Sequence, residues 1–390
     1  MHLAIAAPVS LRSFRGDIPG YRPETDGLGS PIITNLAKEL HRRGHDLTIV
    51  SLSPHEADAG SWDGERLSLH VGRYRREYRA RDAFRAERRD ITRLLRSSDP
   101  NLVHAHWTYE FALGAMTAHS SHLVTVRDWA PEILRFHRHP YWLVRLGMQR
   151  RVLRRAGALT ANSPYIAQRI ERDFGRTVPV IPNGIVLRDG MPPVQRRESL
   201  RIGALNTGFS RRKNVAQLIR AFAAARPKAP ELTLHLAGSD FEPSGPAEVW
   251  ARRHGLHEGV EFVGPIKSTD VPAFMRSLAL FVHPSLEESF GMVLLEAIDE
   301  GTPVIAGRDS GAVPWVLGEG AAGCLLDVRN ADAITRAILE LLDDHGARES
   351  MAVAAWKHVR ERFGLSAVVD LYEEQYDALL GRGAHNGGSR

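Results

Sequence analysis

The sequence predicts an α/β protein with two Rossmann-like domains that face each other across a cleft. Its 390 residues exceed the usual scale of about 100–200 residues per domain. Short apolar strands alternate with amphipathic helices from end to end, which is the pattern of doubly wound parallel sheets. This alternation restarts near the middle of the chain, so we expect a first domain over residues 1–185 and a second over residues 186–365.

The first half begins with the strand HLAIAAP, which is followed by a helix from about Ser30 to Arg43 and by the strand DLTIVSLS. Gly44 supplies the turn between that helix and the second strand. The later strand-like segments of this half each carry a turn signal at their carboxyl end; they are NLVHAHW, HLVTVRDW, ALTANS and PVIPNG. Residues 186–193 contain a glycine and two prolines and are typical of a linker.

The second half contains its own series of strand-like segments: SLRIGALN, LTLHLAGS, VEFVGP, LALFVHPS and TPVIAG. In doubly wound sheets, ligands bind beyond the carboxyl ends of the strands. Candidate functional residues are therefore expected at these ends.

Composition restricts the class of protein. Cys324 is the only cysteine, which excludes an internal disulfide and suits a reducing compartment. No His/Cys cluster has zinc-like spacing, so no metal site is expected. The amino-terminal segment lacks the basic and long apolar regions of a signal peptide, and no run reaches the roughly 18 apolar residues of a membrane-spanning helix. We therefore expect a soluble, cytoplasmic protein.

Positive charge is concentrated in the first half of the chain. Residues 1–185 contain 28 Lys and Arg against 19 Asp and Glu, whereas residues 186–390 contain 23 against 27. The densest segment, residues 73–96, holds ten arginines and four acids. Such a segment can attract an anionic membrane surface or a phosphorylated acceptor, and it is also typical of solvated helix faces. No nucleic-acid-binding module accompanies the charge, so no nucleic-acid partner is expected.

The most informative motif is a strand-to-helix turn that carries two carboxylates, Glu288 and Glu296. The apolar run before the turn predicts a buried strand, and residues 292–298 predict a helix that ends before Gly301. Backbone N–H groups at a helix start are unpaired and lie at the positive end of the dipole, so Gly291 marks a phosphate site. Glu296 can accept hydrogen bonds from ribose hydroxyls, and Glu288 from hydroxyls of a sugar. The motif therefore predicts a pocket for a nucleotide sugar.

This segment resembles the E-x7-E signature of retaining glycosyltransferases of family 4, which have the GT-B fold. The similarity includes SFG, LLEA and GTPVIA around the two glutamates, and it extends to RRGHDLTIV, VIPNGI and RRKN elsewhere in the chain. The resemblance implies a nucleoside diphosphate sugar as donor, no metal ion and retention of the anomeric configuration. It also implies that residues 366–390 form a helix that crosses back to the first domain, followed by a flexible tail.

The resemblance also implies donor contacts from other segments. Lys213, with Arg212 beside it, is expected to neutralise the diphosphate leaving group, although solvated cations at a helix start are the alternative. The glycine-rich loop at Gly29 and the VIPNGI segment at Asn183 are expected to lie against the donor. Backbone amides around the start of the later helix complete the donor contacts: Phe290, Gly291, Met292 and Val293.

The residues after the strand HLVTV depart from the family pattern. Family members commonly have Thr-Val-His-Asp there, whereas this chain has Arg127 before Asp128. Arginine does not deprotonate in proteins, so Arg127 is no general base, but it can clamp a phosphate or fix a sugar hydroxyl. A buried ion pair with an acid is the structural alternative. Asp128 is expected to accept a hydrogen bond from the acceptor.

Two histidines lie near the end of the strand NLVHAHW. We expect them to point to opposite faces of that strand, because side chains alternate along it. His106 is then the candidate for the acceptor site, and His104 is expected in the core.

These features predict a metal-independent, retaining glycosyltransferase of the hexosyltransferase type that needs no cofactor. We expect a UDP-sugar as donor, with a GDP-sugar as alternative, and a glycan, lipid or small-molecule acceptor. A nucleotide-sugar 2-epimerase, a phosphorolytic enzyme of the same fold and a non-catalytic nucleotide-sugar-binding protein remain alternatives. A dinucleotide oxidoreductase is disfavoured, since no Gly-x-Gly-x-x-Gly follows a strand. The predicted catalytic residues are Glu288, Lys213, Arg212, Arg127, Asp128 and His106.

Overall fold

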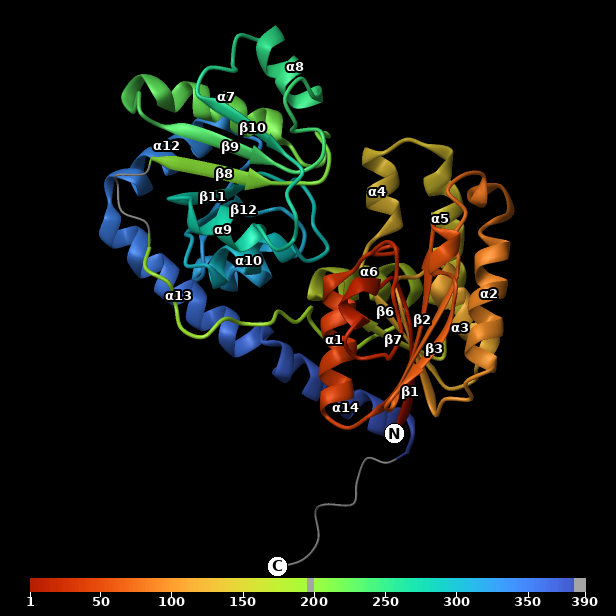
Figure 1. Ribbon diagram of the computed structural model, residues 1–390. Coiled ribbons are helices and arrows are strands. Elements are labelled where there is room, and N and C mark those ends of the chain that lie inside the picture. The colour runs from red at the N-terminus through yellow and green to blue at the C-terminus, as the bar shows by residue number, and fades with distance from the viewer. Residues whose placement is uncertain (195–199, 382–390) are drawn as a thin grey trace, which may run out of the picture. The chain divides into compact units, whose positions relative to one another are not determined.

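The computed structural model describes residues 1–194 and 200–381 (Figure 1). The chain forms two compact units, of which the first consists of Met1–Val186 and Leu365–Arg390 and the second of Leu187–Gly364. Of the flexible tail predicted after the last helix, GRGAHNGGSR, residues 382–390 lie outside the described residues. Each unit contains a sheet with helices packed on it, which confirms the predicted class of two Rossmann-like α/β folds.

The described part of the first unit is built on a seven-stranded sheet with the strand order β3-β4-β2-β1-β5-β6-β7. All neighbours pair in parallel except β3, which is antiparallel to β4. The strands are β1 (His2–Ala6), β2 (Asp46–Ser53), β3 (Gly60–Gly64), β4 (Leu67–Arg73), β5 (Leu102–His106), β6 (His122–Val126) and β7 (Ala158–Ala161). The α-helices are α1 (Pro31–Arg42), α2 (Arg85–Arg96), α3 (Glu110–Ala118), α4 (Ala130–Phe136), α5 (Pro140–Arg155), α6 (Pro164–Phe174) and α14 (Leu365–Leu379).

The second unit contains, within its described residues, a six-stranded parallel sheet with the order β10-β9-β8-β11-β12-β13. The strands are β8 (Arg201–Leu205), β9 (Thr233–Ala237), β10 (Val260–Gly264), β11 (Leu280–His283), β12 (Val304–Gly307) and β13 (Cys324–Leu326). The α-helices are α7 (Val215–Ala225), α8 (Pro246–Arg253), α9 (Val271–Arg276), α10 (Met292–Asp299), α11 (Val313–Val316), α12 (Ala331–Asp343) and α13 (His345–Phe363).

The observed strands differ from the predicted set in two respects. Strands β3, β4 and β13 were not predicted; β3 reads GSWDG, which has little apolar alternation. The predicted strand PVIPNG is wrong, because in that segment Val180 forms only an isolated bridge to Ala161. Two prolines in the segment explain this outcome, since proline has no N–H to donate to a ladder.

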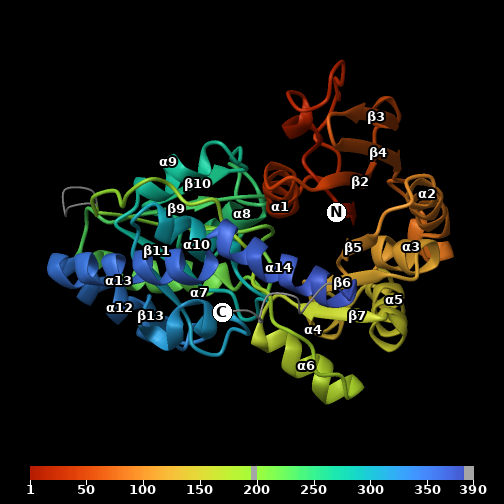
Figure 2. The ribbon, with the colours of Figure 1, turned by 90° about the horizontal axis from the view of Figure 1, so that it is seen from below.

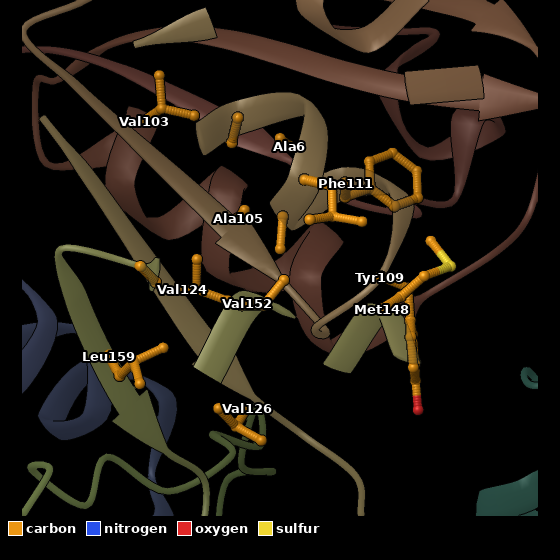
Figure 3. Close-up of a cluster of buried hydrophobic side chains, with 14 of the residues drawn as sticks. Ala6, Val103, Ala105, Tyr109, Phe111, Val124, Val126, Met148, Val152 and Leu159 are labelled. Atoms are coloured by element: carbon orange, nitrogen blue, oxygen red, sulfur yellow. The ribbon is translucent and has the colours of Figure 1, made fainter. Parts of the chain in front are cut away.

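The central strands of the first unit separate apolar side chains from polar ones. Val103, Ala105, Val124 and Val126 point from β5 and β6 into a hydrophobic core and are fully buried (Figure 3). The residues between them face the opposite side of the sheet, because side chains alternate along a strand. On that side the core includes Tyr372 and other residues of α14. The polar residues of β5 and β6 therefore point toward α14.

Charged contacts hold α14 against the rest of the first unit. The guanidinium of Arg43, which follows α1, lies 2.5 Å from Asp370 and 2.6 Å from Glu373. His45 lies 2.6 Å from the second oxygen of Glu373. These contacts place the last helix in the first unit although the second unit precedes it in the sequence. Within residues 1–194 and 200–381, every helix is too short or too polar to span a bilayer.

Candidate functional site

The strand-to-helix turn in the second unit has the predicted form. Strand β11 ends at His283, and α10 begins at Met292 after Gly291, whose φ of 96° favours glycine. The N–H groups of the first turn of α10 have no partner within the helix and lie at the positive end of its dipole. Phe290 is buried and packs edge-on against Phe363, with ring centres 5.6 Å apart, so the turn is anchored in the core. The turn can accept an anion at its backbone.

Lys213 and Glu288 come together at this turn although they are 75 residues apart. The Lys213 Nζ atom lies 2.5 Å from Glu288 Oε1, and His283 Nε2 lies 3.4 Å from the same oxygen. Burial is the largest single influence on Glu288 and opposes its ionisation, but Lys213, His283 and Arg212 together outweigh burial and hold the pKa of this carboxyl well below its usual range. Glu288 is therefore an ionised acceptor of hydrogen bonds at neutral pH. Arg212 turns instead to Glu287, with Nη1 3.3 Å from Oε2.

Two supports of this turn were not predicted from the sequence. Asn214, directly after Lys213, donates its side-chain amide to the carbonyls of Pro284 at 3.1 Å and Val328 at 2.8 Å. Gly311 lies so close to the turn that a Cβ atom there would stand 2.3 Å from the carbonyl oxygen of Glu288. The sequence feature that could have indicated this close approach is the glycine of the GAVP run after β12.

Glu296 lies on α10 and is partly buried. Burial raises the pKa of this carboxyl. Within the described residues it accepts no hydrogen bond and has no ion pair. A partly buried carboxylate without a protein partner is well suited to accept hydroxyl groups of a ligand.

Asn206 is a further candidate that the sequence did not single out. It follows β8 and is buried, and neither side-chain amide atom has a hydrogen-bond partner in the described part of the chain. A Cβ atom on Gly238 would overlap the Asn206 carbonyl oxygen, at 1.7 Å, so the ends of β8 and β9 are closely packed. An asparagine directly after a parallel strand was the signal for this position.

The predicted arrangement of the two histidines in the first unit is wrong. His104 and His106 lie on the same face of β5, with their ring centres 4.0 Å apart. Residues two apart on a strand share a face, which is the physical reason. His104 bonds to Tyr376 and Thr125, each at 2.7 Å, and is part of the packing against α14.

Arg127 forms the centre of a buried polar cluster. Its Nε donates to His106 Nδ1 at 3.1 Å, its Nη1 donates to Asn183 Oδ1, and its Nη2 lies 3.4 Å from the Tyr372 hydroxyl. Burial lowers the pKa of Arg127 and, together with nearby positive charge, holds the pKa of His106 well below its usual range. His106 therefore accepts at Nδ1 as a neutral ring. The structure thus brings together three of the predicted site residues, His106, Arg127 and Asn183.

The two remaining predicted residues of the first unit lie in other contacts. Asp128 accepts a hydrogen bond from the Tyr109 hydroxyl at 2.8 Å, and the pKa of that phenol is raised mainly by burial. Gly29 lies in the loop directly before α1, and its N–H donates to the Asp26 carbonyl at 3.2 Å. Among the described residues, no cluster of three His, Cys, Asp or Glu side chains has the arrangement of a metal site.

Comparisons with known proteins match both halves of the chain. The family model Glycosyltransferase Family 4 matches residues 31–189, and the model Glycosyl transferases group 1 matches residues 205–358. The MMP alpha-(1->4)-mannosyltransferase of Mycolicibacterium hassiacum is 29% identical over 231 residues, which are 56% of this chain and 55% of that protein. The D-inositol 3-phosphate glycosyltransferase of Corynebacterium glutamicum is 33% identical over 167 residues, 42% of this chain and 40% of that protein. The chain thus spans about half the length of these curated relatives.

Solved structures resemble the whole chain in fold. Sucrose-phosphate synthase from Thermosynechococcus elongatus has a TM-score of 0.77 at 19% identity and covers 98% of this chain and 99% of its own. WaaG, a glycosyltransferase involved in lipopolysaccharide biosynthesis, has a TM-score of 0.68 at 17% identity and covers 98% of this chain and 100% of its own. These neighbours show that the chain has the GT-B fold, and the two family models, one on each half, show that it belongs to glycosyltransferase family 4, within the group 1 glycosyl transferases.

Proposed function

We propose that this protein transfers a sugar from a nucleoside diphosphate sugar to an acceptor hydroxyl. The observation that carries the proposal is the Lys213–Glu288 pair in the turn before α10, with Glu296 on α10 itself, whose carboxylate has no partner among the described residues. In this assignment Glu296 accepts the ribose hydroxyls, and the α10 amides with Lys213 hold the diphosphate. Glu288 accepts hydroxyls of the donor sugar.

The proposed reaction proceeds with retention. The acceptor oxygen bonds to the anomeric carbon on the face that the diphosphate leaves, and the bond from that carbon to the diphosphate oxygen breaks. The acceptor proton passes to the departing diphosphate, so no protein base is required. Arg127 is compatible with this route, because a permanently charged guanidinium stabilises phosphate charge without exchanging a proton.

A UDP-sugar is the proposed donor, with a GDP-sugar as alternative. Support comes from the solved structure of Anabaena HepE, a fold neighbour described in complex with UDP and with UDP-glucose. A glycan, a lipid or a small molecule is the proposed acceptor, in keeping with relatives named for inositol phosphate and for lipopolysaccharide core biosynthesis. We place the reaction in the cytoplasm, where the single cysteine stays reduced.

A thermal-shift panel of nucleoside diphosphates and their sugars tests the donor site. We expect UDP or its sugars at about 100 times Kd to raise the free energy of unfolding by about 2.7 kcal/mol. In calorimetry, Glu296→Ala should weaken nucleotide binding about tenfold, because it removes a charge-assisted hydrogen bond to ribose. Its unliganded melting temperature should change little, since the Glu296 side chain has no hydrogen-bond or ion-pair partner among the described residues.

The matched control is Glu361→Ala, which removes an exposed carboxylate from α13 of the same unit. It should bind nucleotide as the parent does. Unchanged nucleotide affinity in Glu296→Ala would reject the ribose assignment. Nucleotide binding without either sugar transfer or donor hydrolysis would instead favour a non-catalytic binding protein.

Metal independence is a separate expectation. Lys213 and the positive end of α10 can neutralise the diphosphate, so turnover should survive excess EDTA without loss. The measurement is initial rate with and without EDTA, followed by addition of Mg²⁺ or Mn²⁺. Activity that disappears with EDTA and returns with either ion would contradict this expectation.

A further inference from the structure

A basic groove lies between α2 and α3 of the first unit, and none of its lining residues is among those assigned to the reaction. The two helices run side by side in both views (Figures 1 and 2). The groove has a volume of about 540 Å³. Its lining consists of five arginines and two threonines: Arg85, Arg88, Arg89, Thr92, Arg93, Arg96 and Thr117.

Close packing of the two helices shapes this groove. A Cβ atom on Gly114 of α3 would lie 2.6 Å from Ile91 of α2, so glycine is what allows the helices to approach. The Thr92 hydroxyl lies 3.1 Å from the Gly114 carbonyl and ties the two backbones together. Arg96 donates to the Thr117 carbonyl at 3.0 Å at the far end. The groove is therefore a built feature of the helix pair.

Few of its positive charges are neutralised by the protein. Arg93 has an ion pair with Asp90 at 3.3 Å, whereas Arg85 and Arg89 have none among the described residues. Arg88 is partly buried, and its Nε atom has no hydrogen-bond partner there. Burial, together with the positive charge of Arg151 on α5, lowers the pKa of Arg88. Like charges held together in this way favour the binding of an anion.

The spacing of the arginines indicates more than one anionic group. Arg85 and Arg96 are eleven positions apart, about 16 Å along a helix. Guanidinium groups bind phosphate through two parallel N–H donors, which lysine cannot reproduce. We propose that the groove binds a ligand that carries at least two phosphate groups, as a soluble polyphosphorylated molecule or as the headgroups of an anionic bilayer.

Direct binding tests the proposal with tripolyphosphate as the soluble probe. A double variant, Arg85→Gln/Arg89→Gln, removes two exposed guanidiniums that have no ion pair within the described chain. We expect calorimetry to show its affinity for tripolyphosphate about 100-fold weaker than that of the parent, since each charge-assisted contact is worth about tenfold. The matched control, Arg253→Gln/Arg336→Gln, removes two exposed arginines of the second unit and should bind as the parent does.

Vesicles distinguish the two sources of phosphate. The same proteins are sedimented with phosphatidylcholine vesicles that contain or lack phosphatidylglycerol, at low and at high salt. If the parent has no tripolyphosphate site and the groove variant loses binding to anionic vesicles, the proposal is supported with lipid as the source of phosphate. If the groove variant loses only tripolyphosphate binding, the proposal is supported with a soluble ligand. Any tripolyphosphate that binds at the donor site still binds in the groove variant. Only the molar equivalent that the parent binds and the groove variant does not is therefore assigned to the groove.

Three outcomes overturn the proposal: the parent binds neither probe, the groove variant binds both as well as the parent, or the control weakens binding equally. The last result would show a response to net charge alone. Donor binding and sugar transfer are measured on the groove variant as separate quantities. Failure of the groove proposal is therefore distinguishable from failure of the proposed function.

Discussion

Replacing Lys213 by methionine is expected to lower sugar-transfer turnover at least about 100-fold, the scale for loss of one group that stabilises developing charge. The ammonium lies 2.5 Å from Glu288 in the turn that leads into α10, and in the proposed reaction the departing diphosphate gathers negative charge at this turn. The substitution also strands the buried carboxylate of Glu288, so the free energy of unfolding should fall by about 3 kcal/mol. Turnover per folded molecule and denaturant unfolding measure the two effects.

The loss of stability in Lys213→Met should depend on pH. Glu288 is ionised in the folded parent because its pKa is held below the usual 4.5. The stability from this pair is therefore complete above pH 4.5 and declines as the pH falls through the lowered pKa. The difference between parent and Lys213→Met should shrink accordingly below pH 4.5.

Two further variants separate catalysis from folding. In Lys213→Met/Glu288→Gln no buried charge is left alone, so stability should recover while turnover stays low. Lys267→Met removes an exposed lysine from a loop of the same unit and should leave both quantities unchanged. Near-parental turnover in folded Lys213→Met would refute the electrostatic role of Lys213.

Replacing Arg127 by histidine is expected to lower turnover about 100-fold even though it restores the residue common in the family. A neutral imidazole lacks the permanent charge and the fork of donors. Arg127 contacts an imidazole, an amide and a phenol, and burial lowers its pKa, so its charge is costly to keep. Removing that charge should shift the melting temperature by no more than a few degrees.

Turnover and melting temperature are measured on the same purified protein, with Arg138→His as the control for an exposed arginine of the same unit. A structural role makes the opposite prediction: a large loss of thermal stability with a normal rate per folded molecule. A variant as fast as the parent would show that Arg127 is no electrostatic clamp.

The sequence alone determined the fold class and the local form of the donor turn. Alternation of apolar strands and amphipathic helices is a local property with a fixed period, so it predicted two parallel sheets before any contact was known. The helix start after Gly291 follows from the same local pattern and is confirmed. The placement of His104 and His106 on one face also follows from local periodicity, because residues two apart on a strand share a face, so the prediction of opposite faces is wrong.

Only the tertiary structure decided which distant side chains meet. Lys213 reaches Glu288 across 75 residues, while its neighbour Arg212 turns to Glu287. Tyr372 reaches Arg127 from a helix that follows the whole second unit in the chain. Such pairings depend on how strand ends and helices pack in three dimensions, and a one-dimensional pattern records the period of each element but not its partners.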